Sequence, residues 1–194
     1  FSHITSTSSQ SRGLNKHIIN NGGKDHPSAN IEFKLGDIVT SVIKCENGET
    51  VVLSHDTSSP RPYSLNFRVQ GTEGIWMVDN NSIYIENISK DEHRWESDEE
   101  YLLKYDHPLW RKFEKQAAGS GHGGMDFFIL NAFVESLKRG LRPPIDVYDA
   151  ASMSVISPLS EKSIRLGSAP VKFPDFTRGK WKSNKPIFGL NKNY

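Results

Sequence analysis

The apolar pattern of this chain changes its period once, near residue 88, and that change limits the folds open to it. Residues 37–86 form short runs of alternating apolar and polar side chains, which is typical of β-strands. Beyond residue 100, apolar side chains recur every three to four positions, as they do in amphipathic helices. Strands followed by helices favour an α+β fold, so we expect an open, mainly antiparallel sheet with helices packed on one face.

Turn signals divide the strand region. Asn47-Gly48 separates two apolar runs and is a strong hairpin signal, because Asn and Gly both tolerate a positive φ. Pro60-Arg61-Pro62 interrupts the pattern, since a proline cannot donate a hydrogen bond to a ladder. The sequence therefore predicts a meander of roughly five strands, to which residues 1–8 add one more. The meander strands are expected at residues 38–45, 50–56, 64–70, 75–78 and 82–85.

The helical region carries its own boundary signals. Helices are expected at residues 101–105, 109–117 and 126–139, with Pro108 at the start of the second and Gly140 as the stop of the third. Asp146 is placed to cap a further helix that runs toward Arg165 and that Pro158 should kink or divide. We expect the tail from Gly167 to wrap the surface.

Length and charge narrow the class of protein. The 194 residues suit one domain, and we treat residues 1–194 as a single domain. The net charge of +1 comes without a basic block, so we expect no nucleic-acid partner. We also expect no membrane span.

Cys45 is the only cysteine, which excludes an intramolecular disulfide. The chain starts Phe1-Ser2-His3 without a methionine or signal peptide, so we interpret it as part of a longer protein of unassigned compartment.

Residues 119–128, Gly-Ser-Gly-His-Gly-Gly-Met-Asp-Phe-Phe, join two predicted helices and contain the clearest candidate site. A phosphate loop would end in Lys-Ser/Thr, and a dinucleotide loop would follow a strand, so neither is expected here. His122 and Asp126 have i,i+4 spacing, but even with His93 and His107 they form no recognised metal motif, so no metal is expected. Asp126 suits the first helical turn, whereas His122 is either a plain loop residue or an imidazole accessible for binding and proton transfer.

Tyr63 is the second candidate. The prolines on either side of Arg61 stiffen the approach to it. Its phenol can donate a hydrogen bond to a sugar hydroxyl or assist proton transfer, although an aromatic side chain beside a turn is more often a packing residue. Arg61 is added as a candidate substrate contact.

Several longer runs of residues resemble one known family. They are SSQSRGLN at 8–15, GKDHP at 23–27, FKLGDIV at 33–39, NGETVVLSHDTSSPRPYS at 47–64, GTEGIWM at 71–77, GHGGMDFF at 121–128, DVYDAASMSVISPLSEKSI at 146–164 and PDFTRGKW at 174–181. Together they resemble the C-terminal half of glycoside hydrolase family 109, the NAD-dependent α-N-acetylgalactosaminidase-like proteins of the glucose-fructose oxidoreductase/inositol dehydrogenase superfamily.

The resemblance implies an architecture that agrees with the pattern of strands and helices. Such proteins carry an N-terminal Rossmann domain that holds NAD, and a C-terminal α+β domain whose open sheet covers the sugar site and makes a homo-oligomer interface. The Rossmann domain is absent from this chain. We therefore expect NAD in the full-length protein and no cofactor on this chain, which alone should be inactive. Export to the periplasm is a family-level expectation.

The resemblance also implies a function. The full-length protein is expected to be a glycosidase that acts on α-N-acetylgalactosaminides by transient oxidation at the sugar C3 and elimination. The alternatives are a sugar or polyol oxidoreductase of the same superfamily and a non-catalytic carbohydrate-binding or assembly module. By resemblance Tyr63 is the catalytic candidate, whereas His122, Asp126 and Arg61 are candidate contacts to the carbohydrate substrate.

Overall fold

The computed structural model describes residues 1–184 and residue 187 of the chain. The described part folds as two compact units. The first unit contains residues 1–61 together with residues 145–184, and the second contains residues 62–144. We describe each unit by itself.

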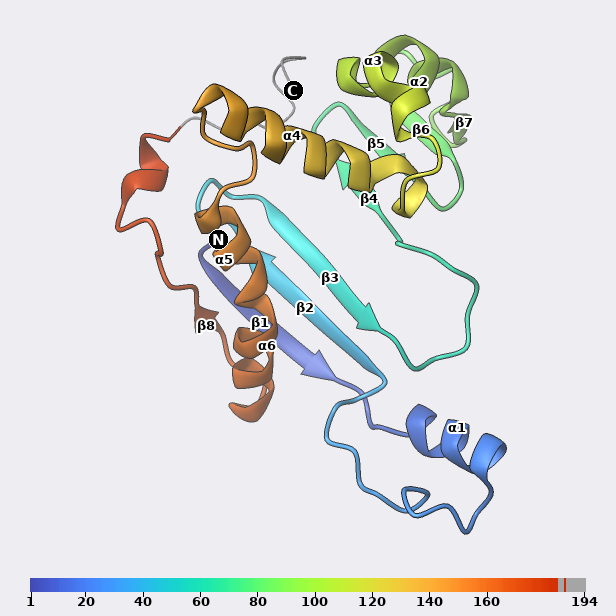
Figure 1. The fold of residues 1–194 in the computed structure, drawn as a ribbon. Helices are drawn as coiled ribbons and strands as arrows, with labels where there is room; N and C mark the ends of the chain where they lie inside the picture. Colours follow the sequence, from blue (N-terminus) through green and yellow to red (C-terminus); the bar gives the residue numbers. More distant parts are fainter. Residues whose placement is uncertain (185–186, 188–194) are drawn as a thin grey trace. The chain divides into compact units, whose positions relative to one another are not determined.

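The first unit is built on an antiparallel sheet of four strands in the order β3-β2-β1-β8 (Figure 1). The strands are β1 (His3–Ser8), β2 (Ile38–Lys44), β3 (Thr50–Asp56) and the two-residue β8 (Val171–Lys172). In the register of the sheet, Ile4 of β1 faces Ile43 of β2 on one side and Val171 of β8 on the other. These three side chains are buried and, with Phe173, form the core of the unit.

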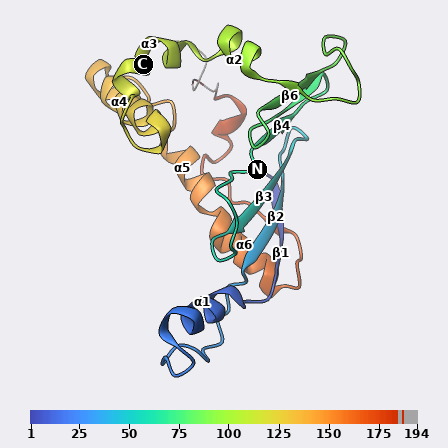
Figure 2. The ribbon, with the colours of Figure 1, turned by 90° about the vertical axis from the view of Figure 1, so that its right-hand side faces the viewer.

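Helix α6 (Ile156–Arg165) covers one face of this sheet, and helix α5 (Val147–Ser154) leads into it (Figure 2). Ile156 and Leu159 of α6, together with Val155 just before it, pack against the buried strand residues. A side-chain capping box starts α5, because Asp146 accepts from the backbone N–H of Tyr148 and Asp149 while the Asp149 carboxylate accepts from the N–H of Asp146. The predicted cap at Asp146 is therefore confirmed, and the helix is divided at Val155, three residues before Pro158.

The connection from β1 to β2 contains helix α1 (Gly13–Gly22), which Asp37 fixes at its start. The Asp37 carboxylate accepts hydrogen bonds from the backbone N–H groups of Arg12 and Gly13, each at 2.9 Å. Gly13 is needed there, since a Cβ would lie 2.8 Å from the Ser58 carbonyl oxygen. Asn15 then donates to the carbonyls of Ala29 and Ile31 and so ties the following loop back to the helix.

The second unit begins with a meander of four short antiparallel strands in sequence order. They are β4 (Arg68–Gln70), β5 (Gly74–Met77), β6 (Ser82–Ile85) and β7 (Glu96–Ser97). Asn81, with φ 47°, makes the turn between β5 and β6. Gly74 allows β6 to approach, because a Cβ would lie 2.5 Å from the Tyr84 carbonyl oxygen.

Three α-helices and a short 3₁₀-helix complete the second unit. They are α2 (Glu99–Tyr105), α3 (Pro108–Ala117), η1 (His122–Gly124) and α4 (Met125–Arg139). Helices α3 and α4 pack through aromatic rings, with Trp110 stacked on Phe128 at a centroid distance of 4.9 Å. Gly140 ends α4 in the left-handed conformation at φ 62°, as predicted.

The α+β class and the helix positions are confirmed, but the strands differ from the single meander that the sequence predicts. The chain forms two open antiparallel sheets, and the break falls at residues 57–67, which contain Pro60 and Pro62. The predicted strand at 64–70 shortens to β4, so the prolines interrupt more of the ladder than expected.

The tail from Gly167, predicted to wrap the surface, also forms regular structure. Strand β8 joins β1 as an edge strand, and Lys180–Lys182 form the 3₁₀-helix η2. Within the described residues, no helix is both long and apolar enough to cross a membrane.

Candidate functional site

The glycine-rich segment at 119–124 is a tight turn between α3 and α4. Gly119, Gly123 and Gly124 have φ values of 84°, 67° and 103°, a region that side chains with a Cβ avoid. His122 also adopts a positive φ, 52°, which is uncommon for a residue other than glycine. The turn is packed at its base, since a Cβ on Gly124 would lie 3.2 Å from the Trp110 ring. The backbone of this turn therefore holds His122 in one place.

His122 and Asp126 form a pair at the start of α4. The His122 Nδ1 lies 2.9 Å from the Asp126 Oδ1. Gly121 makes room for this carboxylate, because a Cβ on Gly121 would lie only 2.3 Å from the Asp126 Oδ2. Asp126 also stands in the first turn of α4, where a negative charge complements the helix dipole.

The contact with Asp126 distinguishes the two ring nitrogens of His122. A carboxylate at Nδ1 favours the tautomer with its proton on Nδ1, which leaves the Nε2 lone pair for a ligand. The His122 side chain is 74% exposed, so Nε2 is accessible. The arrangement can accept a hydrogen bond from a hydroxyl or take up a proton.

The same turn does not fit a phosphate or dinucleotide. It is entered from helix α3 rather than from a strand. The N–H of Gly124 donates to the Gly121 carbonyl at 3.1 Å, and that of Asp126 does so at 3.4 Å. These groups are thus turned inward instead of toward an anion. Nor do three or more His, Cys, Asp or Glu side chains gather as a metal site anywhere in the described part of the chain.

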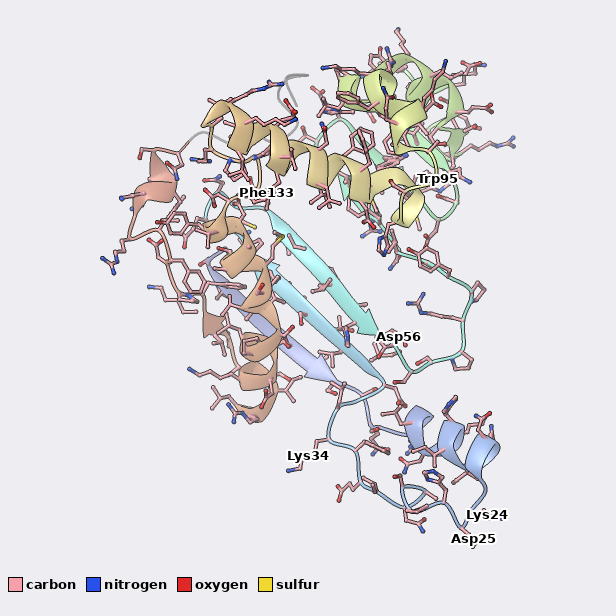
Figure 3. The ribbon with its side chains drawn as sticks, viewed as in Figure 1. Lys24, Asp25, Lys34, Asp56, Trp95 and Phe133 are labelled. Carbon is pink, nitrogen blue, oxygen red and sulfur yellow. The ribbon has the colours of Figure 1, made fainter. Side chains whose placement is uncertain are left out.

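Arg61 lies at the end of the first unit and forms an ion pair with Asp56. Asp56 is the last residue of β3 (Figure 3). The Arg61 Nε lies 3.1 Å from the Asp56 Oδ2, and the Ser59 N–H donates to Oδ1, also at 3.1 Å. Partial burial by itself would raise the pKa of Asp56, but the hydrogen bonds from Ser59 and Arg61 outweigh it and hold that pKa below its ordinary value. The carboxylate therefore stays charged and fixes the turn at residues 56–61.

Tyr63 begins the second unit and is 88% exposed. Together with Pro62, Ser64, Leu65, Val78 and Asp79 it lines an open hollow of about 400 Å³. Ser64 donates a hydrogen bond to Asp79 across this hollow. The phenol of Tyr63 has no hydrogen-bond partner among the described residues, so its hydroxyl is available to a ligand.

The structure brings two of the four predicted site residues together, namely His122 and Asp126. Arg61 is instead joined to Asp56, which sequence reasoning did not single out. The signal was present in the run Asp56-Thr-Ser-Ser-Pro-Arg61, because Asp and Ser before a proline are typical of a turn closed by a side chain.

The family model of the glycosyl hydrolase 109 C-terminal domain matches residues 1–183. This chain belongs to the glycosyl hydrolase 109 family. The match runs through the His122 turn, the Tyr63 hollow and both sheets, so each candidate residue lies within the family's domain.

Named relatives agree with this membership. A glycosyl hydrolase family 109 protein of Parabacteroides distasonis is 53% identical over 98% of this chain. An α-N-acetylgalactosaminidase of Tannerella forsythia is 52% identical over 98% of the chain, and one of Shewanella oneidensis is 41% identical over 96%. The chain covers only 41%, 40% and 42% of the length of these three relatives, respectively.

Proposed function

We propose that the full-length protein is an α-N-acetylgalactosaminidase and that residues 1–194 are its single C-terminal domain. The observation that carries this proposal is the 52% identity to a relative of that name over nearly the whole chain. One family model spans residues of both compact units, which supports treating them as parts of one domain.

We assign the sugar-facing roles to the four candidate residues. His122, oriented by Asp126, offers Nε2 as an acceptor for a sugar hydroxyl. Tyr63 offers a phenol that can pass a proton, and its lack of a partner among the described residues supports that role. Arg61 retains a side chain that is 42% exposed despite its ion pair, which leaves surface for a substrate contact.

NAD is the proposed cofactor of the full-length protein, where it supplies reversible oxidation of the sugar. The glycine turn does not fit it, because the turn follows a helix rather than a strand and the N–H groups of Gly124 and Asp126 already donate to the Gly121 carbonyl. We therefore place NAD on an N-terminal Rossmann domain, within the part of the relatives that this chain does not cover. On this chain, His122, Asp126 and Arg61 bind and orient the sugar, and Tyr63 passes a proton.

A homo-oligomer through the open face of the first sheet is the remaining part of the proposal. Val42 of β2 faces Val52 of β3 on the side opposite the buried Ile43. These side chains are 43% and 66% exposed, respectively. Exposed apolar side chains that adjoin on a sheet favour association with another surface.

The test is an assay of the full-length protein with p-nitrophenyl α-N-acetylgalactosaminide, combined with analysis of the nucleotide released on denaturation. We expect p-nitrophenol to form without added cofactor, and NAD to be recovered near one equivalent. Oxidised sugar and NADH without p-nitrophenol would instead identify a sugar oxidoreductase. Sugar binding without either product would identify a non-catalytic module, and both outcomes would overturn the glycosidase.

A further inference from the structure

A second hollow, of about 630 Å³, lies within the second unit between strands β5 and β6 and helix α2. Its walls are mainly apolar, with Ile83, Ile85 and Leu102 beside the rings of Trp76 and Tyr101. This volume is within the range of ordinary ligand sites, which combine apolar walls with a few placed polar groups.

One of those polar groups is a buried carboxylate. Asp98 lines the hollow and is only 5% exposed. Its Oδ2 accepts a hydrogen bond of 2.7 Å from the Trp76 Nε1. Within the described residues, its Oδ1 has no donor, and no Lys or Arg forms an ion pair with it. This oxygen is not one of the fully buried atoms without a partner, so it is accessible from the hollow and can meet a cation there.

The surroundings of Asp98 strengthen the preference for a cation. Residues 86–100 contain seven Asp or Glu and two Lys or Arg. Lys104 also lines the hollow, but its ammonium lies 5.0 Å from the centre of the Tyr105 ring. An excess of negative charge around a cleft raises the local concentration of a positive partner.

We propose that this hollow receives a lysine side chain from a basic segment of a polypeptide partner. The four methylenes of lysine suit the apolar walls, and its ammonium can meet the Asp98 Oδ1. Arginine is the poorer match, because its guanidinium pairs best with both carboxylate oxygens and Oδ2 already accepts from Trp76. This surface is independent of the proposed hydrolase activity.

The test uses the full-length protein with ¹⁵N-labelled tryptophan and follows the indole N–H resonance of Trp76, assigned with a Trp76→Phe variant. The probes are acetyl-Gly-Gly-X-Gly-Gly-amide peptides in which X is lysine, arginine or norleucine, together with free n-pentylamine. Norleucine keeps the apolar stem without the charge. We expect the lysine peptide to bind at least about tenfold more tightly than the norleucine peptide, since norleucine cannot donate a charge-assisted hydrogen bond to Asp98.

Two variants make the result decisive. Asp98→Asn keeps an acceptor for the Trp76 indole, so an unchanged Trp76 resonance reports a folded site, and the preference for lysine over norleucine should disappear. Glu114→Gln, the control, removes an exposed carboxylate of α3 that does not line the hollow, and it should leave that preference in place. Equal binding of the two peptides, or a preference that survives Asp98→Asn, overturns the proposal. Binding of n-pentylamine as tight as that of the peptide overturns the polypeptide partner in favour of a free amine.

Discussion

Ser163 of α6 takes the place of a strand partner for Ser6 of β1. The Ser163 hydroxyl accepts the Ser6 backbone N–H at 2.9 Å and donates to the Ala169 carbonyl at 2.7 Å. Strand β8 pairs with β1 only at His3 and Ile4, so beyond these residues the edge of β1 would otherwise lack a partner. The small Ser6 and Ser41, whose hydroxyls lie 2.7 Å apart, complete this buried polar cluster.

We predict that Ser163→Ala lowers the free energy of unfolding by about 1–3 kcal/mol, because it leaves the buried Ser6 N–H without a partner. Chemical denaturation followed by circular dichroism measures this change. Ser160→Ala is the matched control on the same helix, where the hydroxyl donates to the Ser157 carbonyl in an exposed position. Equal losses for the two variants would show that the cluster adds nothing beyond helix propensity.

A second prediction concerns Gly121. Gly121→Ala should displace the Asp126 carboxylate, because the new Cβ would lie 2.3 Å from its Oδ2. We therefore expect the hydrogen bond to His122 to be lost and kcat/KM of the full-length enzyme to fall about tenfold or more, because a misplaced sugar-binding group weakens substrate binding. Gly71→Ala is the control, since nothing lies within 4 Å of a Cβ there and its φ is not positive. NMR of the His122 ring nitrogens would report the broken pair directly.

A third prediction follows from the lowered pKa of Asp56. A carboxyl group whose pKa is lower in the folded state contributes stability above its unfolded pKa, and loses it as the pH falls through the folded value. The difference in unfolding free energy between wild type and Asp56→Asn should thus be full near pH 7, should begin to decline near the ordinary pKa of 3.8, and should be lost once the pH has fallen through the lowered folded pKa. Asp25→Asn, in the exposed loop after α1 (Figure 3), removes the same charge as a control. A difference that stays constant down to pH 2 would contradict this prediction.

Local signals explain which features could be predicted from the sequence. The hairpin at Asn47-Gly48, the cap at Asp146 and the stop at Gly140 each depend on a few neighbouring residues, and each is present. The His122–Asp126 pair is local in the same sense, because i,i+4 spacing at a helix start brings two side chains together. The Glu135–Arg139 pair follows the same rule, with 2.9 Å between Oε2 and Nη2.

Features that depend on distant residues could not be predicted. Strand β8 has only two residues, and its place beside β1 follows from the packing of Val171 and Phe173 with Ile4. Likewise, no single turn signal in the sequence predicts that the strands separate into two sheets. Asp98 and Trp76 are 22 residues apart, and only the pairing of β5, β6 and β7 brings them into contact.

The final prediction tests Tyr63 as a catalytic residue. Tyr63→Phe removes only the hydroxyl, which has no hydrogen-bond partner among the described residues, so the unfolding free energy should stay within about 0.5 kcal/mol of wild type. If the phenol passes a proton to or from the sugar, kcat of the full-length enzyme should fall by about 10²–10⁴. Tyr105→Phe is the matched control, a tyrosine that is 68% exposed on α2. Because a residue that only binds the sugar raises KM without lowering kcat, an unchanged kcat would remove Tyr63 from the proton-transfer step.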